Sequence, residues 1–326
     1  MKRLFNLIFL TLLTLMFAMS CEKNISVPQE DDETAVTGLA QGEDEDYLFD
    51  EGFDDGSEDN MYNGYSSFGK GFDKITSPID TVHRFGRKIM DRPRRVITDV
   101  RRISPDSIKV FVAREFVGRF IVIEKEDDTT FVRHVKDLRH VVRRCALYVK
   151  RNPTDEIVRR RWKLAEVSLG QGNSLPAHTI RISQVSVSSS SGINAVFTDP
   201  LHTMLEIPED ILTFALGEEI TVQVKLTNST ANPVDPSGNG STETVLLHYG
   251  TNRHHHARRH FEYAGTDPAT GEQIYEGTWT IGQEPFQVYH AVVDAIDNGT
   301  IFDDDGVTYP YNSTTWSVPY RVVERD

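Results

Sequence analysis

The stretch Glu219-Ile-Thr-Val-Gln-Val-Lys-Leu-Thr227 decides the fold class of the second half of the chain. Its four apolar residues alternate with polar ones, which is the period of an antiparallel strand buried on one face only. Similar short runs recur between turns rich in Gly, Pro, Asn and Asp, at 179–188, 244–249, 273–281, 286–295 and 315–323. This number and spacing of strands predict an acidic, all-β sandwich domain over residues 177–326.

One segment of that domain carries a family resemblance. Residues 287–299, Gln-Val-Tyr-His-Ala-Val-Val-Asp-Ala-Ile-Asp-Asn-Gly, are similar to the penultimate strand and turn of immunoglobulin-like modules in bacterial envelope proteins. The resemblance implies an immunoglobulin-like β-sandwich. A fold of this kind assigns no activity by itself.

The preceding residues, 61–176, predict a second domain of α+β class. A helix is expected over 77–90, because Pro78 suits a first helical turn. Strands are expected at 95–101, 107–116, 119–124 and 162–169, with a linker at 170–176. Residues 130–150 have apolar residues at helical spacing but many β-branched ones, and we favour a long bent strand.

A helix followed by an antiparallel meander resembles the NTF2-like class of small secreted domains. The segments 143–148 (Arg-Arg-Cys-Ala-Leu-Tyr) and 161–168 (Arg-Trp-Lys-Leu-Ala-Glu-Val-Ser) are similar to the two final strands of that class. The resemblance implies a small curved antiparallel sheet with an N-terminal helix. It also implies a concave face that binds a ligand, or a domain that merely dimerises.

The N-terminus has the features of an export signal. Met1-Lys2-Arg3 is basic, residues 4–19 are largely apolar, and Ala18-Met19-Ser20-Cys21 follows. These four residues resemble the lipobox of bacterial lipoproteins, although Ala18 stands where Leu is usual and Met19 where a small residue is usual. The alternative is an ordinary secreted protein that is cleaved nearby.

The lipobox resemblance implies a signal peptide at 1–20 and an acylated Cys21, which palmitate would label. Acyl chains attach a protein to a membrane without a transmembrane helix. Glu22 follows the cysteine, where Asp would resemble an inner-membrane retention signal, so the outer membrane is favoured. The only other cysteine, Cys145, is expected to be a buried apolar residue, and two cysteines exclude a disulfide scaffold.

Charge is distributed in blocks along the chain. Residues 24–60 carry 14 acidic and no basic side chains, which together with Cys21 predicts a disordered acidic tether over 21–60. Residues 61–183 carry 26 basic and 14 acidic side chains, whereas residues 184–326 carry six basic and 20 acidic ones. We therefore expect the acidic part to contact the basic part, or each to attract an outside partner.

Two groups of residues are candidate binding sites. Oxygen-bearing side chains suited to a structural Ca²⁺ gather at Asp297, Asn298, Asp303, Asp304 and Asp305; the alternative is an acidic turn. The second group is an aromatic platform for glycans; its members, Tyr309, Tyr311 and Trp316, would otherwise belong to the core. Five histidines between His248 and His260 are interpreted as part of a polar hairpin rather than a zinc site.

No cofactor motif and no catalytic signature occur in the sequence. Basic content suggests nucleic acid on composition alone, but export and the lack of an aromatic stacking arrangement argue against it. The leading hypothesis is a non-enzymatic, membrane-anchored envelope lipoprotein that binds an envelope protein or an acidic glycan. The alternatives are a glycan-binding protein using the C-terminal sandwich and an enzyme with a pocket in the middle domain.

Overall fold

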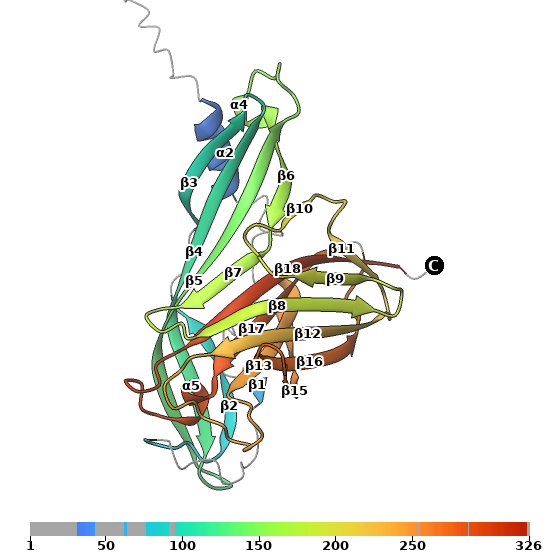
Figure 1. Cartoon of the computed structure of the whole chain (residues 1–326). Helices are drawn as coiled ribbons and strands as arrows, with labels where there is room; N and C mark the ends of the chain where they lie inside the picture. The colour runs from blue at the N-terminus through green and yellow to red at the C-terminus, as the bar shows by residue number, and fades with distance from the viewer. Residues whose placement is uncertain are drawn as a thin grey trace, which may run out of the picture. The chain divides into compact units, whose positions relative to one another are not determined.

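The computed structural model describes residues 31–42, 62–63, 76–90, 95–252, 255–285 and 287–324 (Figure 1). Its helices are α2 (Asp32–Gln41), α4 (Val158–Arg161) and α5 (Asn298–Phe302). The strands of the first half are β1 (Tyr62–Asn63), β2 (Val82–Ile89), β3 (Arg95–Ser104), β4 (Ser107–Lys125), β5 (Phe131–Lys150), β6 (Trp162–Ser168) and β7 (Gly170–Ser174). Those of the second half are β8 (Ile180–Ser189), β9 (Asn194–Phe197), β10 (Met204–Glu206), β11 (Leu212–Ala215), β12 (Glu219–Asn228), β13 (Glu243–Asn252), β14 (His255–His260), β15 (Glu262–Thr266), β16 (Gln273–Thr280), β17 (Val288–Asp297) and β18 (Ser313–Val323). The protein is mostly β, as predicted.

The strands form two sheets. The larger follows the order β1-β2-β4-β5-β7-β18-β17-β13-β14, with β3 beside β4, β6 beside β5, β10 beside β6, and β11 parallel to β18. The smaller follows the order β15-β16-β12-β8-β9 and is antiparallel. It contains the stretch that begins at Glu219, now β12, whose alternating burial confirms a half-buried strand.

The larger sheet curls upon itself. Tyr62 of β1 stacks on His260 of β14 with ring centroids 6.4 Å apart, so the two ends of the strand path meet. The space inside the curl is filled by one hydrophobic cluster, which includes Phe85, Phe116, Phe120 and Tyr311. The concave face predicted for residues 61–176 is therefore filled rather than open.

Two further clusters hold the remaining layers together. One lies between the smaller sheet and the β17–β18 part of the larger sheet, and contains Leu226, Trp279 and Trp316. The other lies under α2 at the end of the long β4–β5 hairpin, where Val36 packs with Tyr148 and Trp162.

The structure corrects four local predictions. Residues 77–90 contain strand β2 rather than a helix, and the predicted linker 170–176 contains strand β7. The predicted break at Gly118 lies inside the single strand β4. Helix α2 occupies part of the predicted disordered tether, since the alanines of Asp32–Gln41 are buried against β3, β4 and α4. The rest of residues 21–60 lies outside the described residues.

Strand β7 also bears on the predicted domains 61–176 and 177–326. It pairs on one side with β5 and on the other with β18, near the C-terminus. Strands from both predicted domains therefore belong to one sheet, and Asp32–Asp326 form one compact unit. The basic and acidic parts of the chain therefore contact each other through strands of this sheet.

Gly118 gives the first testable prediction. A β-carbon at this position would lie 2.1 Å from the Lys88 carbonyl oxygen and 2.9 Å from the Ile89 Cα, so the paired strand β2 would have to move. We expect Gly118→Ala to lower the free energy of unfolding by about 1–3 kcal/mol, measured by urea denaturation. Gly282→Ala, where nothing lies within 4 Å of the added carbon, is the control. Equal denaturation midpoints for the two variants would contradict the prediction.

Candidate functional site

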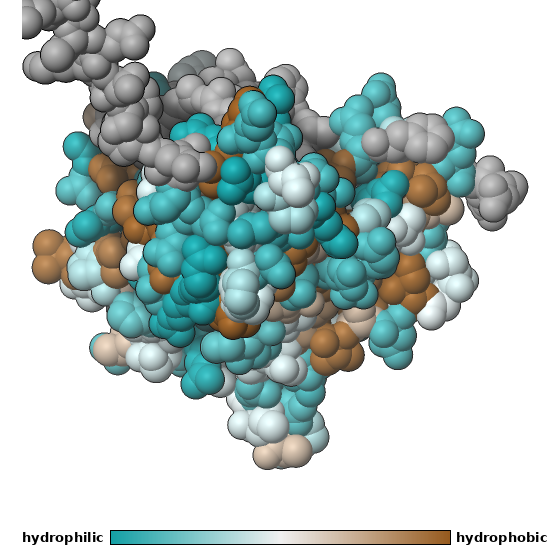
Figure 2. Space-filling view, turned by 90° about the horizontal axis from the view of Figure 1, so that it is seen from above, coloured by the Kyte–Doolittle hydropathy of each residue, from teal (hydrophilic) through white to brown (hydrophobic). Residues whose placement is uncertain are grey.

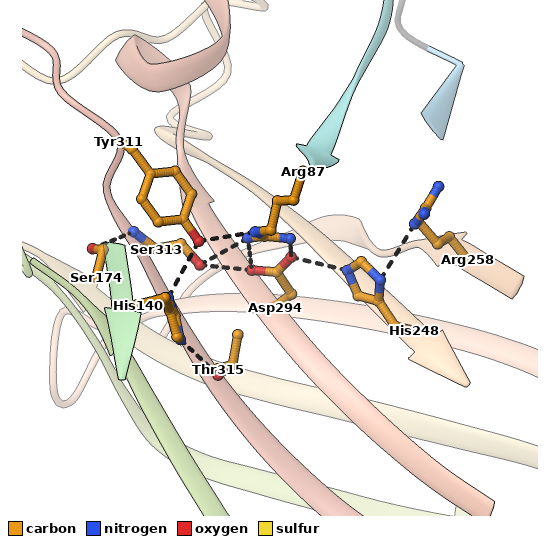
Figure 3. A network of polar contacts seen from close by, with 9 residues as sticks. All are labelled: Arg87, His140, Ser174, His248, Arg258, Asp294, Tyr311, Ser313 and Thr315. Atoms are coloured by element: carbon orange, nitrogen blue, oxygen red, sulfur yellow. Dashed lines mark hydrogen bonds and ion pairs between the residues drawn. The ribbon is translucent and has the colours of Figure 1, made fainter. Parts of the chain in front are cut away.

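The densest cluster of chemistry-bearing side chains lies inside the curled sheet (Figure 3). Arg87 of β2 extends across the interior to Asp294 of β17, and both are buried. Arg87 Nη1 donates to Asp294 Oδ2 at 2.6 Å and Nη2 donates to Oδ1 at 2.8 Å, which makes a bidentate ion pair. The pair joins residues 207 positions apart in the chain.

Strand alternation explains why these two polar side chains point inward. Arg87 lies between Phe85 and Ile89 on one face of β2, and Asp294 lies opposite Thr315 of β18 on the same face of its sheet. In each strand, alternate side chains point into the core, and Arg87 and Asp294 both occupy inward positions of this kind. Each charge then requires a partner within the core.

The Asp294 carboxylate has two more donors. Ser313 Oγ donates to Oδ1 at 2.7 Å, and His248 Nε2 lies 2.9 Å from Oδ2. Because Arg258 Nε donates to His248 Nδ1 at 3.3 Å, the His248 proton resides on Nε2 and points at Asp294. Burial opposes ionisation of Asp294, but the Arg87 charge and these donors hold its pKa well below the usual range.

On the other side of Arg87 the network continues through neutral groups. Arg87 Nε donates to Tyr311 Oη at 2.8 Å, and Tyr311 Oη lies 3.2 Å from His140 Nδ1. Burial and the Arg87 charge lower the pKa of His140 to about 3, so its ring is neutral at physiological pH. Its Nε2 then donates to Thr315 Oγ1, 3.2 Å away. Burial raises the pKa of Tyr311 to about 12, and its hydroxyl stays protonated.

This geometry does not form a nucleophilic triad. His248 and Asp294 have the arrangement of a base and its orienting carboxylate, but the second ring nitrogen of His248 accepts from Arg258 instead of a hydroxyl group. The Ser313 hydroxyl donates to Asp294 itself and is fully buried. Chemically, the cluster is suited to fixing β2 against β17 and β18.

The predicted aromatic platform is wrong. Tyr309, Tyr311 and Trp316 are 2%, 1% and 2% exposed, so their ring faces are not available to a sugar. Tyr309 donates its hydroxyl to the Asn232 carbonyl at 2.9 Å, and Trp316 belongs to the core between the sheets. All three residues therefore belong to the core, which was the alternative prediction.

The predicted calcium ligands do not converge. Asp297 accepts from the Gly299 backbone, Asp303 from the backbone of Thr76 and Ser77, and Asp305 from that of Val307. Asn298 accepts from Thr244, and Asp304 pairs with His134 at 2.9 Å. Within the described part of the chain, no group of three or more acidic, histidine or cysteine side chains is arranged to hold a metal ion.

The remaining sequence candidates are placed as follows. His248 and His260 belong to the hairpin of β13 and β14, and His248 is buried. Cys145 is buried as predicted, and burial raises the pKa of its thiol. Cys21 and the lipobox-like residues lie outside the described residues.

An apolar cavity of about 30 Å³ lies between the two sheets, with Val222, Trp279 and Tyr320 among its lining residues. A volume of this size holds roughly two water molecules and no organic ligand. The cavity is therefore a packing defect.

Neither a protein-family model nor a curated protein matches this chain.

Sequence reasoning missed the buried network, but one signal for it was present. Asp294 interrupts the apolar run Ala291-Val-Val-Asp-Ala-Ile296 in a predicted strand. A carboxylate in a buried strand implies a buried cation, and Arg87 supplies it.

Proposed function

We propose that this chain is a non-enzymatic lipoprotein of the bacterial cell envelope, anchored in the outer membrane through Cys21 and acting as a binding or assembly module. The observation that carries the proposal is the sequence Ala18-Met19-Ser20-Cys21 after a basic start and an apolar run. None of the helices among the described residues is long and apolar enough to span a membrane.

Two features of the structure support a binding module over an enzyme. The titratable groups of the buried network bond to one another inside the curled sheet, away from any substrate. The concave face that would hold a substrate is filled by Phe116, Phe120 and Tyr311. The buried aromatics remove the platform on which glycan binding by the sandwich depended.

The finer fold assignment is also a proposal. We infer that the smaller sheet, packed on β17 and β18, forms an immunoglobulin-like sandwich with the larger sheet. The paired strands β5 and β6 support an NTF2-like resemblance only in its final two strands, because the N-terminal helix of that class is absent from residues 77–90.

Acylation is tested by labelling cells with radioactive palmitate. Wild type is expected to incorporate label and Cys21→Ala to lose it completely, since the thiol is the attachment point. Cys145→Ala is the matched control and is expected to retain label, because that thiol is buried. Undiminished labelling of Cys21→Ala would refute the anchor.

A further inference from the structure

The chain enters its compact unit at one end of the long β4–β5 hairpin. Asp32, the first residue of α2, accepts from Lys150 Nζ at 2.9 Å and from Trp162 Nε1 at 3.0 Å. Lys150 and Trp162 are the paired residues where β5 ends and β6 begins. We call residues 102–107 and 150–163 the entry end, because the β3–β4 turn lies beside Val149 in the same place.

Chain length limits how far the entry end lies from an anchor at Cys21. Ten residues lie between Cys21 and Asp32, which are therefore eleven residue steps apart. A fully extended chain advances about 3.3–3.6 Å per residue, so this segment spans about 40 Å at most. The hairpin's other end, at the β4–β5 turn, is some eighteen residues of extended strand further away, or about 60 Å. The entry end is therefore the part of the described structure that the shortest stretch of chain joins to Cys21.

The entry end has the composition of a surface that meets phosphate groups. The entry end carries seven basic and three acidic side chains, and two of the basic ones, Arg102 and Lys150, pair with Asp32 of α2. Arg151, Arg160 and Lys163 are exposed. Of the acidic residues, Asp155 accepts from the Ile157 backbone through its carboxylate and so helps to shape the loop.

Exposed apolar side chains accompany these charges. Ile103 is 60% exposed and Ile157 is 47% exposed, and both belong to the entry end. The face seen from above in Figure 2, which looks onto this end, is predominantly hydrophilic with separate apolar residues. Basic residues interspersed with single aliphatic ones suit contact with lipid headgroups rather than insertion into the hydrocarbon.

We propose that the entry end docks on the anionic phosphate headgroups of the leaflet that holds the anchor, so that the sheets project away from the membrane. The inference rests on the proposed function, since the anchor supplies the proximity. The surface itself belongs to the compact unit and can be tested without the lipid.

The test uses the chain 22–326, which contains the whole compact unit, and sedimentation with vesicles. The vesicles are phosphatidylcholine with or without phosphatidylglycerol. We expect sedimentation with the anionic vesicles at low salt and little at high salt. Arg151→Glu/Arg160→Glu should weaken partitioning roughly thirtyfold, because basic residues near such a surface each contribute about fivefold.

The matched control is Lys88→Glu/Arg181→Glu, which changes the net charge equally at exposed positions on β2 and β8. It should bind the anionic vesicles within about twofold of the unaltered chain. Equal binding of the two double variants, or no binding of the unaltered chain at low salt, would overturn the proposal. Because the chain 22–326 carries no lipid, this outcome is independent of palmitate labelling, which tests the anchor alone.

Discussion

Asp294→Ala is expected to lower the free energy of unfolding by about 3–5 kcal/mol, because it leaves the buried Arg87 guanidinium without its counter-charge. It also removes the acceptor of Ser313 and of His248. Urea denaturation at neutral pH measures the loss.

Two variants separate a buried-charge effect from simple loss of packing. Arg87→Met/Asp294→Leu removes both charges, and we expect it to be more stable than Asp294→Ala because no uncompensated charge remains. Asp137→Ala removes a carboxylate that pairs with Arg119 on an exposed face, and should cost about 0–1 kcal/mol. A loss for Asp294→Ala as small as that for Asp137→Ala would show that the network does not stabilise the fold.

Glu243 is expected to make stability fall as pH rises. Its carboxyl is buried, accepts from Tyr275 Oη at 2.8 Å, and has its pKa raised by burial to about 7. In the unfolded chain the carboxyl group ionises near its ordinary pKa of 4.5. Between about pH 4.5 and 7 the native state holds a proton that the unfolded state releases, so the contribution to stability decreases by about 3 kcal/mol.

Glu243→Gln isolates this contribution, since the amide does not titrate. We expect the free energy of unfolding of wild type, minus that of the variant, to fall by about 3 kcal/mol between pH 5 and pH 8. Denaturation by urea at several pH values gives the difference. The exposed Glu276→Gln is the matched control. A difference that does not change with pH would mean that Glu243 is charged in the native protein throughout.

The strands whose faces differ in polarity were predicted well from the sequence. Alternation in the stretch from Glu219 placed β12 within one residue, and the β-branched content of 130–150 correctly favoured the long strand β5. In both cases the local pattern agrees with the final environment, since one face is buried and the other is not.

The helix over 77–90 was predicted from Pro78, and the apolar pattern of β2 did not contradict it. Ile79, Val82, Phe85 and Ile89 recur at near-helical spacing, and the inward position between the last two is occupied by Arg87. Because the inward position 87 carries a charged residue, the alternation of apolar and polar residues that indicates a strand is not visible in this sequence. Arg87 is buried because it pairs with Asp294, which lies on a strand far away in the sequence.

The candidate sites failed for a related reason. The oxygen-rich residues from Asp297 to Asp305 and the aromatics from Tyr309 to Trp316 were candidate sites because of their side-chain types and their closeness in the sequence. In the structure this segment closes the interior of the curled sheet, and Phe302 and Tyr309 pack beside Ile79 of the β2 region. The local sequence pattern does not indicate that a residue will be buried by a segment more than two hundred residues away.

The central position of β18 has a consequence for the order in which the protein folds. This strand comes after β7, β11 and β17 in the chain, and yet all three flank it in the middle of the larger sheet. Pairings of such long range form slowly, because a large loop must close before any contact is gained. The larger sheet, which contains the strands of the first half of the chain, is therefore complete only after β18 has paired with them.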